Sequence, residues 1–255
     1  MLKKELSLLL KILFWASPVI FWSVWQIIMV RPELFWVLAS SSLILLLPVA
    51  YEAAGRKKNW RFLYILLSLL LSLASYYLFI SFLASPWQVE LLWLLVLVYF
   101  YRYLWAAKKM ANGGEAGDWM LITMYGCLFT YFLASSSLFG LQSFLSLSPW
   151  LLLLAFIPFV FASIRSLAFS QGWNHHKDIW IWPLLTLLSL QIAMMLLLLP
   201  LNYLVAGILN TLAFYSMVNF LRLYNNKNLT RRKIKNYAWF SALSLIIILL
   251  TARWL

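Results

Sequence analysis

The chain has 255 residues, of which 65% are hydrophobic and 11% are charged, and its mean hydropathy is +0.88. A soluble domain is about half apolar and about a quarter charged, so this composition excludes a water-soluble globular protein. With about 20 residues for each crossing of a bilayer, the length allows about eight to ten transmembrane helices joined by short connections.

Nine apolar segments follow one another along the chain, separated by short stretches that contain Pro, Gly or charged residues. Lipid offers the backbone no hydrogen-bond partners, so unbroken apolar runs predict helices rather than the alternating strands of a barrel. We therefore predict an all-α, polytopic integral membrane helix bundle of about nine transmembrane helices. The predicted helices are 6–30, 34–51, 62–84, 91–106, 119–139, 149–164, 182–200, 203–221 and 237–253.

The first predicted helix begins like a signal peptide, with Lys3 and Lys4 before an apolar run. That run is longer than a signal-peptide core, and no cleavage pattern of small residues follows it. We therefore expect a retained first transmembrane helix.

Two of the predicted helices, 91–106 and 149–164, are short for a transmembrane segment. Either of them could be tilted or re-entrant. All predicted connections are short, so residues 1–255 are predicted to form a single transmembrane domain with no separate soluble domain.

The basic residues predict how the chain is oriented. With a cytoplasmic N-terminus, nine helices place every Lys and Arg except Arg31 and Arg253 on the inner side of the membrane. The positive-inside rule requires such an asymmetry of short connections. We therefore predict a bacterial-type cytoplasmic membrane, with the N-terminus inside and the C-terminus outside.

Two basic runs stand out, GRKKNWR at 55–61 and YNNKNLTRRKIKNYAW at 224–239. Such runs anchor the topology and attract the anionic lipid headgroups of the cytoplasmic face. A basic run alone is a weak sign of nucleic-acid binding, and no RNA-binding motif accompanies it. The expected partners are therefore membrane lipids and other membrane subunits, without nucleic acid. The residues predicted to contact headgroups are Arg56, Lys57, Lys58, Arg231, Arg232 and Lys233.

Charged residues are absent from the middle of every predicted helix, which argues against proton-coupled or ion-coupled transport. Neutral polar residues do occur there. Gln191, Asn210 and Thr211 are the candidates for lining a substrate path, because a buried amide that faces lipid is costly. The alternative is structural, since small and polar residues at helical spacing also let neighbouring helices approach closely.

A second group of candidates lies on the predicted inner side. His175 and Asp178 would share a helical face, and Glu115 and Asp118 have the same spacing of three residues. Together with Arg165, these side chains could meet a divalent metal or a phosphate-bearing lipid. A metal site needs three or four convergent ligands, and a solvated interfacial loop explains the same residues, so no metal or other cofactor is predicted.

The sequence favours a multi-pass protein that acts as a permease-like or scaffold subunit of a larger membrane assembly and handles an apolar or lipid-like substrate. No P-loop motif occurs, so we expect any energy to come from a partner. One alternative is a purely structural membrane component. Another is a lipid-modifying enzyme of the inner headgroup layer, with the catalytic residues His175, Asp178, Glu115, Asp118 and Arg165.

Overall fold

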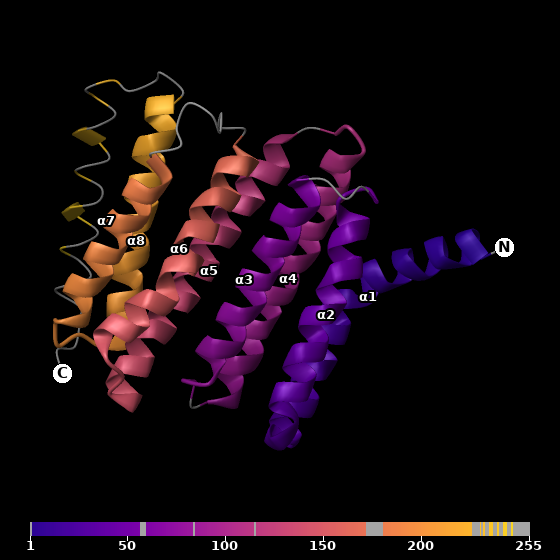
Figure 1. The fold of residues 1–255 in the computed structure, drawn as a ribbon, viewed down its shortest axis with the longest axis horizontal. Helices are drawn as coiled ribbons and strands as arrows, with labels where there is room; N and C mark the ends of the chain where they lie inside the picture. Colours follow the sequence, from indigo (N-terminus) through magenta and orange to yellow (C-terminus); the bar gives the residue numbers. More distant parts are fainter. Residues whose placement is uncertain are drawn as a thin grey trace. The chain divides into compact units, whose positions relative to one another are not determined.

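The structure is a computed structural model that describes residues 2–56, 60–83, 85–114, 116–171 and 181–225, and the single positions 230, 232, 235, 236, 239, 242, 243 and 246. Within these residues the fold is all-helical, as predicted (Figure 1). The elements are α1 (Leu2–Val30), the short 3-10 helix η1 (Pro32–Leu34), α2 (Phe35–Ala53), α3 (Trp60–Ile80), α4 (Pro86–Ala111), α5 (Ala116–Leu145), α6 (Pro149–Ser170), α7 (Ile181–Leu197) and α8 (Tyr203–Asn225).

Seven helices in the described part of the chain are long and apolar enough to cross a membrane, namely every α-helix except α7. α7 has 17 residues. At 1.5 Å per residue its length is about 26 Å, slightly less than the ~30 Å hydrocarbon core of a bilayer. The helical class is therefore confirmed, whereas the predicted count of about nine is not. The last predicted helix, 237–253, lies outside the described residues apart from positions 239, 242, 243 and 246.

The two shortest predicted helices are longer in the structure. α4 has 26 residues and α6 has 22, and each is one uninterrupted helix. Pro86 and Pro149 begin these helices at the first position, where the N–H that proline lacks would have no partner in the helix. Lys108 and Lys109 occupy the last turn of α4, where positive charge is favourable. The predicted start of α6 at 149 is correct. Hydropathy discounts polar and charged residues, so it ends α6 before Arg165 and places both ends of α4 too far inside the helix.

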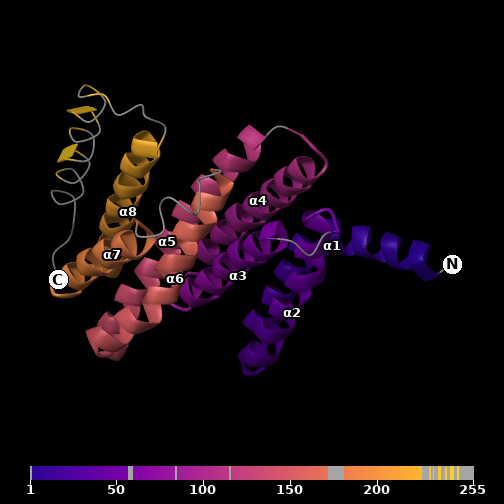
Figure 2. The same ribbon diagram turned by 45° about the horizontal axis from the view of Figure 1, so that its top comes forward.

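The chain divides into two compact units. Unit 1 comprises Met1–Ala74 and Leu83–Gly126, and unit 2 comprises Ser75–Phe82 and Cys127–Leu255. In unit 1, α1, α2 and α4 pack against one another, and in unit 2, α7 packs against both α6 and α8 (Figures 1 and 2). α3 and α5 each contribute residues to both units.

Aromatic side chains form much of the buried core in each unit. In unit 1, Phe21 and Phe100 are buried and meet edge to face, with 5.9 Å between their ring centroids. In unit 2, Tyr131 and Phe214 are buried and stack with their centroids 4.0 Å apart. Lipid tails are as apolar as leucine, so hydrophobicity alone does not hold membrane helices together. Ring contacts of this kind supply part of the packing energy, about 0.5–1.5 kcal/mol for each pair.

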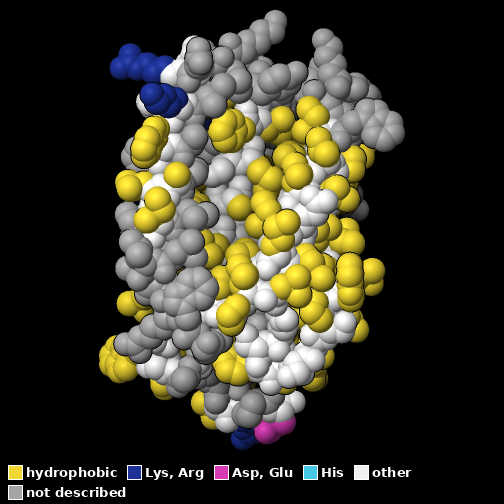
Figure 3. Space-filling view, turned by 90° about the vertical axis from the view of Figure 1, so that its left-hand side faces the viewer, with side chains coloured by type: hydrophobic (Ala, Val, Ile, Leu, Met, Phe, Trp, Pro, Cys, Tyr) yellow, Lys and Arg dark blue, Asp and Glu magenta, His cyan; other side chains and the backbone are white. Residues whose placement is uncertain are grey.

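Apolar side chains also cover the outside of the helices. Leu91 and Leu94 of α4, Leu154 of α6 and Leu187 of α7 are all more than half exposed. Figure 3 shows hydrophobic side chains spread over the described part of one face, with charged side chains at its ends. Soluble monomers rarely expose apolar patches larger than a few hundred Å². The exposed apolar surface and the long helices together indicate a multi-pass membrane protein.

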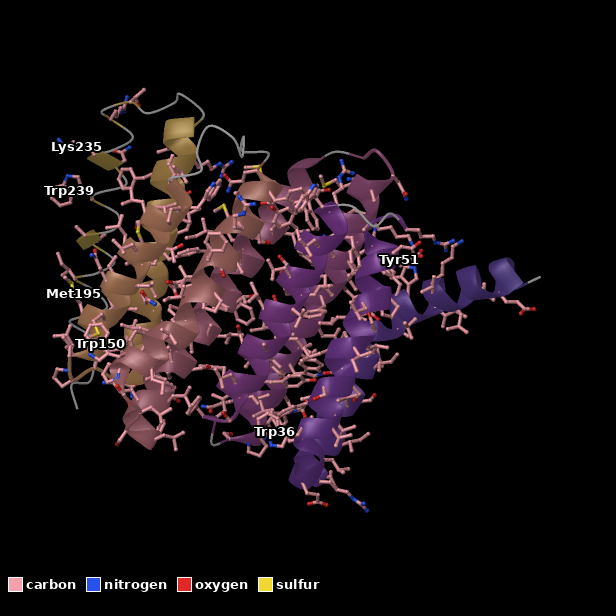
Figure 4. The ribbon with its side chains drawn as sticks, viewed as in Figure 1. Trp36, Tyr51, Trp150, Met195, Lys235 and Trp239 are labelled. Atoms are coloured by element: carbon pink, nitrogen blue, oxygen red, sulfur yellow. The ribbon has the colours of Figure 1, made fainter. Side chains whose placement is uncertain are left out.

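Exposed tryptophans mark the beginnings of several helices. Trp36, Trp87 and Trp150 are the second residues of α2, α4 and α6, and their exposed fractions are 78%, 83% and 72%. Figure 4 labels Trp36 and Trp150 near the ends of their helices. The amphipathic indole ring prefers the headgroup level of a bilayer, so exposed tryptophans at helix ends are typical of membrane-spanning helices.

α5 and α8 approach each other closely at Gly207 in unit 2. A Cβ added to Gly207 would overlap the side chain of Ser136 and lie 2.9 Å from the Ser136 Cα. Small residues allow membrane helices to approach in this way and to gain dispersion energy along the contact. A glycine is therefore needed at position 207 because Ser136 leaves no room for a side chain, and not because of the backbone dihedral angles.

We expect Gly207→Ala to destabilise the purified protein by about 1–3 kcal/mol, because the added methyl group must displace the backbone of α5. The matched control is Gly117→Ala near the start of α5, where an added Cβ has no neighbour within 4 Å. This control should leave stability unchanged or raise it by up to about 1 kcal/mol, since alanine favours helices over glycine. Thermal unfolding in detergent measures both variants, and equal shifts would contradict the close contact.

Candidate functional site

The middle of α5 carries an unusual number of buried polar side chains. Tyr131, Ser135, Ser136 and Ser137 are all 0% exposed. Most serine hydroxyls in membrane helices bond back to their own helix, and Ser137 does so by donating to the Leu133 carbonyl at 2.7 Å. The small residues of this stretch let neighbouring helices cover α5 closely, so its polar groups are shielded from lipid.

One of these serines links α5 to α8. The Ser135 hydroxyl donates to the Tyr131 carbonyl at 2.8 Å and lies 3.4 Å from the Gly207 carbonyl. It is also 3.5 Å from the Thr211 hydroxyl, which itself donates to the Gly207 carbonyl at 2.7 Å. Hydrogen bonds between membrane helices contribute about 0.6 kcal/mol each on average. These contacts have a structural role and leave little free capacity for a ligand.

Three other polar side chains, one from each of α5, α7 and α8, lie together without hydrogen bonds of normal geometry, and we call them the Tyr131 cluster. It consists of Tyr131 of α5, Ser189 of α7 and Asn210 of α8, which are between 0% and 1% exposed. Ser189 and Asn210 lie next to the Tyr131 hydroxyl. The Tyr131 Oη, Ser189 Oγ and Asn210 Nδ2 atoms have no hydrogen bond of normal geometry within the described part of the chain. Thr123, Ser136 and Ser163 also have buried hydroxyls without such a bond, but the Tyr131 cluster gathers three polar groups from three helices, which makes it a candidate binding position.

Aromatic rings surround this polar cluster. The Tyr131 ring stacks on Phe214 at an interplanar angle of 10°. Its centroid is also 5.6 Å from that of Phe156 and 6.0 Å from that of Phe159, and Phe156 and Phe159 stack on each other at 5.4 Å. Small-molecule sites combine apolar walls with a few polar groups in this way. The arrangement suits a molecule with an apolar body and one polar group.

The Tyr131 cluster is electrically neutral. Among the described residues, Glu52 is the one charged side chain that is buried, and it belongs to unit 1. An isolated charge transferred into such an apolar interior would be strongly destabilised. The cluster therefore suits a neutral hydrogen-bond acceptor better than a phosphate or a carboxylate.

Glu52 forms a buried ion-paired group at the ends of α2 and α4. Its carboxylate accepts from the Arg56 Nε at 2.8 Å and from the Lys108 Nζ at 3.1 Å. The Lys108 Nζ also lies 4.6 Å from the centroid of the Phe14 ring, within the range of a cation–π contact. Arg56, predicted to contact lipid headgroups, is thus held against Glu52.

The turn that brings Arg56 back to Glu52 is left-handed. Gly55 and Arg56 have φ angles of 69° and 64°. A Cβ on Gly55 would lie 3.2 Å from the Ala111 Cβ, so glycine suits both the dihedral angles and the close approach of α4. This group was not predicted from the sequence, although a Glu and an Arg four residues apart are a recognisable signal.

The residues predicted for a lipid-modifying enzyme are not brought together within the described part of the chain. His175, Asp178 and Glu115 lie outside it. Asp118 is exposed and accepts from the Lys109 Nζ at 2.9 Å. The Arg165 guanidinium lies 5.7 Å from the centroid of the Trp182 ring. No group of three or more metal-binding side chains occurs among the described residues.

The residues predicted for a substrate path have different surroundings. Asn210 is buried in the Tyr131 cluster, and Thr211 is half-buried and bonded to Gly207. Gln191 is exposed on α7. The structure therefore brings Asn210 and Thr211 to the α5 contact but does not bring Gln191 there.

Tyr131 and Ser189 were not among the residues predicted from the sequence. A signal for Ser189 exists, because Thr186, Ser189 and Ala193 are small or polar residues at helical spacing and are all buried. Tyr131 carries no comparable signal, since tyrosine is frequent throughout this chain.

Of the other residues predicted to contact headgroups, Arg232 is exposed. Lys57, Lys58, Arg231 and Lys233 lie outside the described residues. Their contact with anionic lipid stays a prediction.

Comparison with known proteins gave no relatives. A scan against protein-family models and searches of the curated proteins and of the solved structures found no match to this chain. The chemistry of the described residues is therefore the guide to function.

We expect Glu52→Gln to destabilise the protein by about 1–3 kcal/mol, because Arg56 and Lys108 lose the carboxylate that accepts their hydrogen bonds. The control is Asp118→Asn, which removes the exposed ion pair with Lys109 and should cost less than about 1 kcal/mol. Thermal unfolding in detergent at neutral pH compares the two. A larger effect of Asp118→Asn would contradict a structural role for Glu52.

Proposed function

We propose that this multi-pass membrane protein is a permease-like subunit of a larger membrane assembly and that it moves or holds an apolar or lipid-like substrate. The observation that carries the proposal is the Tyr131 cluster, in which three helices place neighbouring polar groups inside an apolar unit without hydrogen bonds of normal geometry. Buried donors without a well-formed hydrogen bond are costly, at up to about 1–3 kcal/mol each. A substrate that supplies the missing partner recovers that cost.

The cluster defines the polar part of the substrate. A phenol, a serine hydroxyl and an amide N–H can all donate hydrogen bonds. They therefore favour an acceptor such as an ester or amide carbonyl. No described cation lies buried in unit 2 to neutralise an anionic group, so the substrate group at this position is neutral.

The aromatic walls define the apolar part of the substrate. Phe156, Phe159 and Phe214 surround the Tyr131 ring. Acyl chains and isoprenoid chains are both compatible with such walls, because the contact is non-directional. A lipid-like molecule with a neutral carbonyl near its apolar chains fits both requirements.

Partners and location complete the proposal. The chain lies in a bacterial-type cytoplasmic membrane with the N-terminus inside and the C-terminus outside, and anionic lipids contact its cytoplasmic face. The distribution of Lys and Arg supports this orientation. Other membrane subunits pack on its apolar outer faces, and any energy for transport comes from one of them.

The proposal is tested with a diacylglycerol analogue that carries a photoreactive diazirine, incorporated into nanodiscs with the purified chain. We expect crosslinks on α5, α7 and α8 near the Tyr131 cluster. Asn210→Leu should reduce their yield about two- to tenfold, the equivalent of one lost hydrogen bond of about 0.5–1.5 kcal/mol. The control Gln191→Leu changes an exposed amide of α7 and should leave the yield unchanged.

Movement is distinguished from holding by reconstitution into liposomes that contain a fluorescent neutral lipid. Dithionite bleaches only the outer leaflet, so a permease gives bleaching beyond that of protein-free liposomes, and Asn210→Leu slows it. Crosslinking at the cluster without faster bleaching would indicate a lipid-holding scaffold. Crosslinks spread evenly over all helices and insensitive to Asn210→Leu would contradict both roles.

A further inference from the structure

α1 contains a proline whose lost hydrogen bond is replaced from nearby. Pro18 lies inside the helix and has no N–H to donate to the Phe14 carbonyl. The Ser17 hydroxyl donates to that carbonyl instead, at 2.9 Å. The hydroxyl of Tyr101 in α4 donates to the neighbouring Trp15 carbonyl at 3.1 Å. The backbone at 14–18 is therefore held in a bent form by contacts within unit 1.

The burial of α1 changes at this bend. Before Phe14, no described side chain of α1 is buried, and Leu8, Leu9 and Ile12 are 62%, 60% and 60% exposed. From Phe14 onward, buried residues recur at helical spacing as far as Ile28. Figures 1 and 2 show the first turns of α1 directed away from α2. The described side chains in the first turns of α1 therefore do not contribute to the buried core of unit 1.

The bend lies at the charged end of α2 and α4. The Phe14 ring is 4.6 Å from the Nζ of Lys108, in the last turn of α4, and Lys108 pairs with Glu52 near the end of α2. The part of α1 from Phe14 to Val30 has the length of α7, about 26 Å, which is slightly less than the ~30 Å hydrocarbon core, and a mismatch of this size costs only a fraction of a kcal/mol per ångström. The residues before Phe14 are therefore not needed for the crossing.

We propose that residues 2–13 form a surface helix that lies in the plane of the inner headgroup layer and binds anionic lipid, and that α1 begins to cross the membrane only at Phe14. This revises the predicted transmembrane helix 6–30. The segment LKKELSLLLKIL has three lysines and one glutamate, a net charge of 3 − 1 = +2. Basic helices with one apolar side lie in a bilayer interface in this way.

The exposed apolar side chains of residues 2–13 are more favourable in contact with lipid than in contact with water. Leu8, Leu9 and Ile12 continue directly into a helix that enters the bilayer, so the acyl boundary is their nearest apolar surroundings. Lys11 is exposed in the same turn and can extend its ammonium group to the phosphates while its stem stays in the apolar layer. Positive charge makes this contact stronger with anionic than with neutral headgroups.

The test uses the full chain in nanodiscs that contain phosphatidylglycerol. Cys127→Ser removes the single native thiol, and serine keeps a donor for the Ser163 carbonyl, which the Cys127 Sγ approaches at 3.6 Å. A spin label is then placed at each position from 7 to 13, and its accessibility to lipid-soluble oxygen and to an aqueous nickel chelate is measured. We expect these values to alternate with a period of 3.6 residues about a constant mean depth.

The expected pattern is specific. Labels at positions 8, 9 and 12 favour oxygen, and labels at 7 and 11 favour the nickel chelate. In phosphatidylcholine nanodiscs, the difference in oxygen and nickel accessibility between these two sets of positions should fall several-fold, because the attraction to anionic headgroups is lost. A label at Val19, which is exposed beyond the bend, should be deeper and insensitive to lipid charge.

Three results would overturn the proposal. A steady increase in depth from position 7 to position 13 would mean that this segment crosses the membrane. Low accessibility to both reagents at 8, 9 and 12 would mean that a second copy or another protein covers it. An unchanged contrast in phosphatidylcholine would remove the preference for anionic lipid.

Discussion

Inside a bilayer, every backbone N–H and C=O group must find its partner within the protein, and this requirement shapes the whole chain. Helices satisfy it almost everywhere, and hydroxyl side chains satisfy it where proline interrupts a helix, as Ser17 does for the Phe14 carbonyl. Many other serines, such as Ser72 and Ser137, also bond to carbonyls of their own helix. Against this background, the Tyr131 cluster differs in that three buried polar groups without hydrogen bonds of normal geometry lie together.

The lack of polar partners in lipid also determines where charged side chains can be buried. Glu52 is buried only because two cations reach it at the ends of α2 and α4, where the ammonium and guanidinium groups keep partial contact with solvent. The Tyr131 cluster lies among apolar and aromatic side chains and has no such compensation, so it is built from neutral groups. The two sites differ because a carboxylate needs a counter-charge, whereas hydroxyl and amide groups need only a hydrogen-bond acceptor.

Hydropathy predicted the helical class and most of the helices, because lipid requires long apolar runs whatever the tertiary contacts are. It misplaced both ends of α4, where Pro86 and Lys108 are favourable for reasons of helix chemistry, and it ended α6 too early, at residue 164. It also could not separate the first turns of α1 from the rest of that helix, since both parts are apolar. Asn210 was predicted because a buried amide is rare in lipid. Tyr131 and the pairing of Glu52 with Lys108 depend on which helices are neighbours, which the sequence does not state.

The exposed tryptophans at the second positions of α2, α4 and α6 have a consequence for the surrounding bilayer. An indole ring held at the headgroup level resists sliding of its helix along the membrane normal. A bilayer of unsuitable thickness must then thin, thicken or make the helices tilt, at a cost of a fraction of a kcal/mol for each ångström of mismatch. We therefore expect acyl-chain length in the host membrane to affect the tilt of α2, α4 and α6, because a hydrocarbon layer of matching thickness is the most favourable for all three rings.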